Sequence, residues 1–534
     1  MTTGSFLQPT TESRNHSLSS GVFSLHWFAK WEYDKSFFAD ASTGKALIRV
    51  TGHFSSLNTV KSGRFATGLR QRSDKPGMAQ DTALLKRAYA PARLAMKYHP
   101  FYQGKIEIVS KVPVDSYDDF AIWYTPGVAD PCKEIQKNPE RVYDYTNKWN
   151  SIAIITDGTR VLGLGDIGPE AGLPVMEGKS LLFKYLGGVD AYPLCLGTKR
   201  PEEIENAVRW LQPSFGGINL EDISQPKCFD ILDALKQDLR IPVWHDDQQG
   251  SGTVVCAGLI NALKVVGKKI GSASICMLGA GAANIAVARI IMEAGVSPGN
   301  IIMVDSKGIL NRQRTELEEE YHAKWQICLK TNSEGRTGGF KEALKGADVL
   351  IAMSTPGPGV IPRGLMSTMA DDSVIFACAN PIPEVWPWEA KEAGAKIVAT
   401  GRSDFPNQVN NSLGFPGIFR GTLDVRAKMI SDEMCIAAAN ELAKIAEDRG
   451  IDEERILPSM SDWEVFPREA AAVGAEAVRQ GLARLKLTRK ELYERATMII
   501  SHARKSTELL MRKGLIRPIP HSSVRSRTKR RIAR

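Results

Sequence analysis

A glycine-rich turn is the feature of this sequence that most restricts its fold. The turn, Gly279-Ala-Gly-Ala-Ala-Asn284, follows the apolar run Ser274 to Leu278 and opens Ala282 to Ala294, where Ala, Val and Ile recur on one helical face. A strand, a tight turn and a helix in this order set backbone N–H groups against a pyrophosphate. The next apolar run, Asn300 to Val304, ends in Asp305, where a ribose-binding carboxylate belongs. The sequence therefore predicts a Rossmann-like sheet.

The expected dinucleotide ligands come from this turn and the strand after it. They are Gly279, Ala280, Gly281, Ala282, Ala283 and Asp305. The third position of the turn is Asn284, where Gly or Ala normally lets helix and strand pack closely. Asp305 should accept a hydrogen bond from a ribose 2′-hydroxyl and disfavour a 2′-phosphate, although Lys307 stands close enough to neutralise one. NAD is favoured, and NADP stays open.

Two acidic doublets, Glu221-Asp222 and Asp246-Asp247, each follow a strand-like run. Those runs are Gly217 to Leu220 and Ile241 to Trp244. In open α/β sheets the ligand crevice lies beyond the carboxyl ends of the strands. Carboxylates that converge there from two strands would hold Mg²⁺ or Mn²⁺ and leave positions free for a chelating substrate. A plainer interpretation makes Asp222 or Asp246 a helix N-cap.

Strand-like runs alternate with amphipathic helices from about residue 78 to 420, which indicates an α/β chain. We expect a substrate- and metal-binding α/β domain, a Rossmann-like parallel-sheet domain, and C-terminal helices that pack back on the first domain. The expected ranges are 1–77 for an N-terminal appendage, 78–246, 247–410, 411–515, and 516–534 for a basic tail.

Individual elements are also predicted. Thr82 to Tyr98 has helical spacing, and Ala427 to Met511 is helical without a strand signal. Asp157-Gly158 predicts a hairpin turn between two apolar runs, Ser151 to Thr156 and Arg160 to Leu164. The remaining strand candidates are Ala191 to Leu196, Asp348 to Ala352, Ser373 to Ala377 and Lys396 to Ala399.

Composition narrows the class of protein. A chain of 534 residues with 43% hydrophobic content is long enough for about two or three domains with real cores. No apolar stretch approaches the roughly 18 residues of a membrane helix. The eight cysteines form no CxxC pair, which fits a reducing, cytoplasmic location. Much of the net charge of +9 sits in the tail from Val524 to Arg534, so nucleic-acid binding is not favoured.

The first 77 residues are rich in Ser and Thr and poorly periodic. They could be a regulatory domain, a targeting segment, or an over-extended start with Met78 as the true first residue. Glu12, Glu32 and Asp34 argue against an organellar transit peptide, which should be poor in acid. Disorder or over-extension is the favoured interpretation.

Several polar residues can be interpreted either as ordinary structural residues or as functional ones. Gly172 to Ser180 imitates a phosphate-binding loop, but five residues separate its glycines where four are required. Lys179 could be a surface residue at the start of an apolar helix, or a general base. Tyr124, before a Pro-Gly break, is usually a core residue. Asn380 and Asn411 are more often turn residues than ligands.

Many short motifs in one order closely resemble the malic enzymes, in particular the shorter bacterial and archaeal type. The resemblance covers about residues 78 to 480 and lies in YTPGVADPC, TDGTRVLGLGDIGPE, VMEGKS, GGINLEDIS, HDDQQG, GAGAAN, VDSKGI, CANP and GRSDFPNQVNNSLGFPGIFRG. It implies oxidative decarboxylation of L-malate to pyruvate and CO₂ with NAD or NADP. It also implies a homodimer or higher assembly, because the family's active sites lie near subunit contacts.

The resemblance further implies roles for single residues. Tyr124 matches the family's general acid and Lys179 its general base, while Glu221, Asp222 and Asp247 match its Mg²⁺ or Mn²⁺ ligands. Arg160 corresponds to the arginine that binds a substrate carboxylate. Asn380, which is expected to serve substrate and cofactor, and Asn411, favoured over Asn410, match the substrate amides. The chain departs from the family pattern at Gln249, Ser251 and Asn284.

Two other classes of function remain open at this point. An amino-acid or 2-hydroxy-acid dehydrogenase also combines a catalytic lysine with a Rossmann-like domain but generally needs no divalent metal. A dinucleotide sensor could keep the fold without turnover, a case that rests on Asn284 and Gln249.

Overall fold

The computed structural model describes residues 76–520. Almost all of the predicted appendage, residues 1–75, and most of the basic tail, residues 521–534, lie outside the described residues. The predicted helix at Thr82 to Tyr98 is part of a longer one, α1 (Pro76–Tyr102). Among the residues that are described, no helix is both long and apolar enough to cross a bilayer.

The first sheet has four parallel strands in the order β2-β1-β3-β4. They are β1 (Ser151–Thr156), β2 (Asp190–Cys195), β3 (Gly217–Leu220) and β4 (Val243–His245). The crossovers are α5 (Pro169–Gly187), α6 (Pro201–Leu211) and α7 (Lys227–Asp238). The strand order reverses between β1 and β3, so the ligand crevice of this sheet is expected at the carboxyl end of that pair.

The predicted hairpin after Asp157 is wrong. Both neighbours of β1 run parallel to it, and residues 160–164 form a loop with one isolated bridge, Val161 to Gly165. The Asp157-Gly158 turn is present, with Gly158 at φ +69°, but the chain turns into α5 instead of pairing back. A turn signal is local, whereas the partner of a strand is decided by the whole sheet.

The second sheet has six strands in the order β10-β9-β8-β5-β6-β7, and all pairs are parallel except β6 with β7. Its strands are β5 (Ile275–Leu278), β6 (Ile301–Asp305), β7 (Gly308–Ile309), β8 (Val349–Ala352), β9 (Val374–Ala377) and β10 (Ile397–Thr400). The order reverses between β5 and β8, which makes this the expected Rossmann-like sheet. The glycine turn leaves β5 at that reversal.

Helices cover this sheet on both faces, as a parallel sheet requires. They include α8 (Ser251–Val265), α9 (Ala282–Glu293), α10 (Leu317–Glu320), α11 (His322–Lys330), α12 (Phe340–Leu344), α13 (Arg363–Met366) and α14 (Pro387–Glu392). The strands between them are almost entirely buried, which explains their continuous apolar runs.

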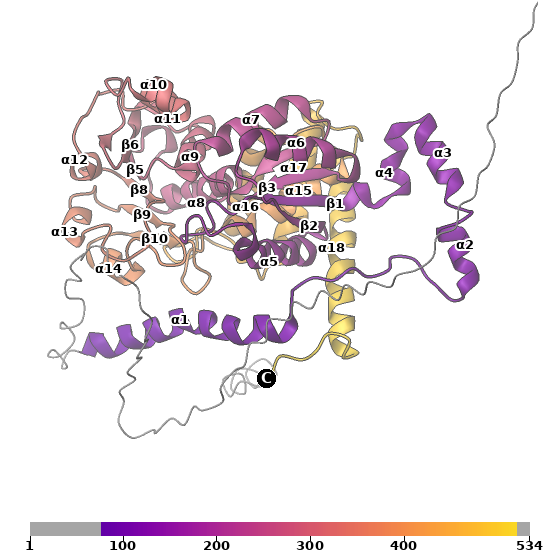
Figure 1. Cartoon of the computed structure of the whole chain (residues 1–534). Helices are drawn as coiled ribbons and strands as arrows, with labels where there is room; N and C mark the ends of the chain where they lie inside the picture. The colour runs from indigo at the N-terminus through magenta and orange to yellow at the C-terminus, as the bar shows by residue number, and fades with distance from the viewer. Residues whose placement is uncertain (1–75, 521–534) are drawn as a thin grey trace, which may run out of the picture. The chain divides into compact units, whose positions relative to one another are not determined.

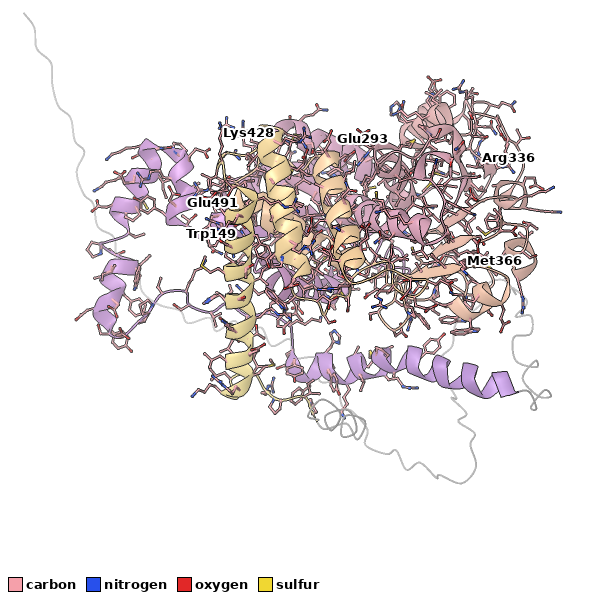
Figure 2. The ribbon with its side chains drawn as sticks, turned by 180° about the vertical axis from the view of Figure 1, so that it is seen from behind. Trp149, Glu293, Arg336, Met366, Lys428 and Glu491 are labelled. Atoms are coloured by element: carbon pink, nitrogen blue, oxygen red, sulfur yellow. The ribbon has the colours of Figure 1, made fainter. Side chains whose placement is uncertain are left out.

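The C-terminal helices pack back on the first domain, as predicted. They are α15 (Phe415–Asp424), α16 (Asp432–Asp448), α17 (Val465–Arg479) and α18 (Arg489–Arg512). Phe183 of α5 meets Phe415 and Phe419 of α15 with ring centroids 4.5 and 5.3 Å apart. Figure 2 shows Trp149 beside the helix that carries Glu491, where the guanidinium of Arg495 lies 5.7 Å from the Trp149 ring.

An arm, residues 103–150, lies between α1 and the first strand of the first sheet. It contains α2 (Phe120–Trp123), α3 (Ala129–Lys137) and α4 (Val142–Tyr145). Neither α2 nor α3 has a buried residue, and in Figure 1 both lie apart from α5 and β3. Large apolar side chains on the arm are solvent-exposed, among them Ile108, Val109, Phe120, Ile122 and Trp123.

Candidate active site

Three carboxylates meet where β3 and β4 end. Glu221 and Asp222 directly follow β3, and Asp247 lies in a short π-helix, η5 (Asp246–Gly250), that follows β4. One oxygen from each lies within 4.8 Å of the others. The Asp222 N–H donates to Asp247 Oδ2 at 2.8 Å, while Asp222 Oδ2 is buried without a hydrogen-bond partner among the described residues. A free, buried carboxylate oxygen beside two more acids fits a hard divalent cation.

The electrostatics of the cluster lead to the same conclusion. Burial and the nearby charge of Asp247 raise the pKa of Asp222 to about 8. Burial also raises the pKa of Glu221 well above its ordinary value, despite the attraction of Lys179. Carboxylates that resist ionisation for these reasons are stabilised in their charged form by a cation. The N-cap interpretation is wrong, because α7 is preceded by Pro226 and α8 by Gly250.

Lys179 lies inside α5, not at its start, and its side chain is buried. The Lys179 amine donates to Glu221 Oε1 at 2.5 Å and to Asp246 Oδ2. Burial acts to lower the pKa of Lys179, but the charges of Asp246 and Glu221 outweigh it and raise that pKa above its usual range. The interpretation as a surface lysine is therefore wrong. Two carboxylates from neighbouring strands hold this amine in one place.

Asp246 is a site residue that we did not expect from the sequence. It is fully buried, and its Oδ2 accepts from Lys179 and from Asn411 Nδ2, the latter at 2.5 Å. Its neighbour Asp247 reaches Asp222 instead. The doublet itself was the available signal, since two adjacent acids after one strand can serve two different partners when the backbone turns tightly between them.

The structure also separates the two candidate asparagines. Asn410 Oδ1 accepts from the Ser412 N–H at 3.0 Å, and Asn410 Nδ2 donates to the Gly401 carbonyl at 3.0 Å. Asn410 is thus a capping residue with its amide used by the backbone. Asn411 joins the Asp246 and Lys179 group, which supports its choice as a substrate ligand.

Gly250 has to be small for this group to form. A Cβ on Gly250 would lie 2.0 Å from Asp246 Oδ1 and 3.2 Å from Asn411 Cβ. We expect Gly250→Ala to displace Asp246 and to lower turnover by about 10²-fold, the usual cost of misplacing a site group by about 1 Å. Steady-state rates measure this. Gly364→Ala is the control, because a Cβ there meets nothing within 4 Å. Equal rates in both variants would show that the position of Asp246 does not matter.

Arg160 lies on the loop after β1, beside the carboxylates, and Asn380 lies on the loop after β9. The Arg160 N–H donates to the Asp222 carbonyl at 2.9 Å, and the Arg160 side chain is exposed. On the same loop, a Cβ at Gly163 would lie 2.2 Å from the Asn380 carbonyl oxygen. The loop after β1 therefore touches the loop after β9. This contact brings together the two loops that carry the expected substrate residues.

The interpretation of Tyr124 as an ordinary core residue is wrong. Tyr124 follows α2 on the arm, and its side chain is 71% exposed. The structure brings Lys179, Asn411 and the acids together, whereas α2, which Tyr124 directly follows, lies apart from α5, the helix that carries Lys179 (Figure 1).

The glycine turn fits a pyrophosphate. Gly279 has φ +96°, and a Cβ there would lie 2.6 Å from the Met353 carbonyl oxygen. Gly281 precedes α9, so the first N–H groups of that helix, beginning with Ala282 and Ala283, have no partner inside the helix. The departure at Asn284 has a role: its Nδ2 donates to the carbonyls of Leu278 and Gly279, at 2.9 and 2.7 Å, and holds the turn.

Gln249, which also departs from the family pattern, is fully buried and holds the backbone at the end of β4. Its Oε1 accepts from the His245 N–H at 3.2 Å, which ties the end of β4 to η5. Asp305 ends β6 as expected, but its carboxylate is already held by Arg314 and Lys324.

Comparisons with known proteins agree with this geometry. The model of the malic enzyme N-terminal domain matches residues 103–236, and the model of the malic enzyme NAD binding domain matches residues 248–478. The chain is 46% identical to the bifunctional malic/malolactic enzyme of Bacillus subtilis (strain 168) over 401 residues, 75% of this chain and 96% of that enzyme. It is 49% identical to the NAD-dependent malic enzyme of Geobacillus stearothermophilus over 382 residues, 71% of this chain and 78% of that enzyme.

Structural similarity extends over both sheets. The crystal structure of the Entamoeba histolytica malic enzyme superposes with a TM-score of 0.80 and 46% identity, covering 83% of this chain and 92% of that one. Two matching domain models in sequence order, close relatives over most of their length and a shared fold together establish the conclusion. This chain belongs to the malic enzyme family.

Proposed function

We propose that this protein oxidatively decarboxylates L-malate to pyruvate and CO₂, reduces NAD or NADP, and requires Mg²⁺ or Mn²⁺. The observation that carries the proposal is the convergence of Glu221, Asp222 and Asp247 beside Lys179, next to a Rossmann-like sheet. The family and the names of the relatives, which include malic enzymes, support it.

In the proposed reaction each side chain has one task. A cation held by the three carboxylates would polarise the substrate and, as a neighbouring positive charge, lower the pKa of Lys179. Arg160 pairs with a substrate carboxylate, and Asn380 and Asn411 orient the substrate. Lys179 takes the proton of the 2-hydroxyl as hydride leaves C2 for the nicotinamide.

The second half of the reaction breaks the bond between C3 and the distal carboxylate. The bonding electron pair stays with C3, CO₂ leaves, and Tyr124 gives its proton to C3 of the resulting enolate of pyruvate. Lys179 then returns its proton to solvent. The deprotonated Tyr124 regains a proton, so the balance is one malate and one NAD(P)⁺ to one pyruvate, one CO₂ and one NAD(P)H, with no net proton released.

The decisive assay follows NAD(P)H absorbance with purified protein, malate and Mn²⁺, together with release of CO₂. An amino-acid or 2-hydroxy-acid dehydrogenase would form NAD(P)H without CO₂ and would tolerate EDTA. A silent sensor would bind the dinucleotide without any turnover. Either result would exclude the proposed reaction.

The domain division also remains a proposal: residues 78–246 for substrate and metal, 247–410 for the dinucleotide, and 411–515 to complete the catalytic domain. The two family models meet between residues 236 and 248, which supports the first boundary. All eight cysteines are free thiols, which supports a reducing, cytoplasmic location.

We further propose a homodimer or higher assembly in which the arm of one copy completes the site of another. Two observations support this arrangement: large apolar side chains of the arm are exposed, and α2, which Tyr124 directly follows, lies apart from α5, the helix that carries Lys179 (Figure 1). A second copy that buries the arm would remove apolar surface from water and supply the missing acid.

Co-expression of two inactive variants, Tyr124→Phe and Lys179→Ala, tests this arrangement. If each site takes Tyr124 from one copy and Lys179 from another, random assembly restores about a quarter of the wild-type sites. The control pair is Lys179→Ala with Asp222→Asn, whose residues belong to the same chain's cluster and should restore nothing. An inactive first mixture would place the Tyr124 of each site in its own chain.

A further inference from the structure

The carboxylate of Asp305 has no acceptor position left for a ribose. Its Oδ1 accepts from the Lys307 N–H at 2.9 Å and from Arg314 Nη1 at 3.2 Å. Its Oδ2 accepts from Arg314 Nη2 at 3.3 Å and from Lys324 Nζ at 3.2 Å. A carboxylate offers about four acceptor positions, so these donors use all of them. Only 7% of the side chain is exposed.

The two cations that hold Asp305 remain partly accessible. The side chains of Arg314 and Lys324 are each 15% exposed, and the backbone of exposed Lys307 adjoins them. Glu316 is the other acid of the group and accepts from Arg314 Nε at 2.5 Å. Two acids and three bases leave the group with a net charge of one positive unit.

The group lies where the adenosine ribose of a dinucleotide is expected. Asp305 is the last residue of β6, and the preceding residue, Val304, accepts from the Gly279 N–H at 2.9 Å. The glycine turn and the Asp305 group are therefore adjacent at the carboxyl edge of the sheet. In this kind of sheet the acid after the second strand meets the ribose 2′ position.

We propose that Arg314 and Lys324 bind the 2′-phosphate of NADP, so that the protein binds NADP more tightly than NAD. A 2′-hydroxyl would need an acceptor that Asp305 no longer offers. A 2′-phosphate needs donors, and both side chains have N–H groups beyond those that Asp305 uses. Asp305 is then a positioning residue that holds the two cations. The inference deepens the proposed function by naming its preferred cofactor, and it reverses the preference predicted from Asp305 alone.

Isothermal titration without malate tests the inference apart from catalysis. The probes are adenosine 2′,5′-bisphosphate and adenosine 5′-monophosphate. We expect the wild-type protein to bind the bisphosphate at least about tenfold more tightly, because the extra phosphate makes charge-assisted hydrogen bonds. Lys324→Ala should abolish most of this ratio and leave the affinity for the monophosphate within about threefold.

Two further variants sharpen the result. Lys330→Ala removes an exposed lysine from the other end of α11 and should leave the ratio unchanged. Lys324→Arg keeps the charge and should preserve it. A wild-type protein that binds both probes equally, or a Lys324→Ala protein with an unchanged ratio, overturns the inference. Failure of malate turnover with the ratio intact would refute the proposed function instead.

Discussion

Lys179→Ala is expected to lower the rate of NAD(P)H formation from malate by about 10²- to 10⁴-fold, the usual range for a positioned acid or base. The structure supplies the reason. The Lys179 amine is fixed between Glu221 and Asp246, next to the predicted cation ligands. Among the described residues no other amine is bonded to this acid cluster, so none could take over as the base. Stopped-flow or steady-state measurement of NAD(P)H absorbance gives the loss of rate with NAD and with NADP.

The control for this variant is Lys184→Ala on the same helix. Lys184 is 45% exposed and pairs with Asp190 at 2.7 Å, away from the acids of the cluster. Thermal unfolding of both variants separates a catalytic loss from a folding defect, because Lys179→Ala leaves two buried acids without their cation. Near-normal turnover in a folded Lys179→Ala protein would remove Lys179 from the mechanism.

Removal of the divalent cation is expected to abolish turnover, and Mn²⁺ should restore it. Asp222→Asn keeps the size of the side chain but removes its charge, so we expect turnover to fall by about 10³-fold or more. A loss of this size corresponds to the several kcal/mol that a bound metal contributes to stabilising the transition state. The buried, unpartnered Asp222 Oδ2 is the atom that this substitution changes most directly.

Thermal unfolding gives a second measurement that does not depend on activity. Mn²⁺ should raise the unfolding temperature of the wild-type protein, because a ligand that binds only the folded state stabilises it. The increase should be smaller in Asp222→Asn and unchanged in Asp238→Asn, whose exposed carboxylate pairs with Arg209. Full activity after dialysis against EDTA, without any shift by Mn²⁺, would contradict a cation site.

Local patterns predicted most strands within one or two residues. The strand-like runs before Glu221 and before the glycine turn became β3 and β5, because apolar periodicity depends on near neighbours. The long crossovers between them then required parallel pairing, which gave both sheets and both ligand edges. The expectation that the C-terminal helices return to the first domain is also confirmed by their packing on α5.

Expectations failed where the answer depended on a partner far along the chain. The Asp157-Gly158 turn did not form a hairpin, since β1 found better neighbours in β2 and β3. The sequence left Lys179 open as a surface residue or a general base, and its contacts with Glu221 and Asp246, which follow two other strands, excluded the surface interpretation.

The sequence by itself determined the family, the order of strands and helices, and the acids and glycines that end up at the strand edges. It could do so because these signals lie within a few residues of one another. Only the tertiary structure decided which partners those residues meet: Asp246 with Lys179, Asn411 instead of Asn410 at the site, and Asp305 held by Arg314 and Lys324. Each of these contacts joins different elements, so its geometry exists only after the chain has folded.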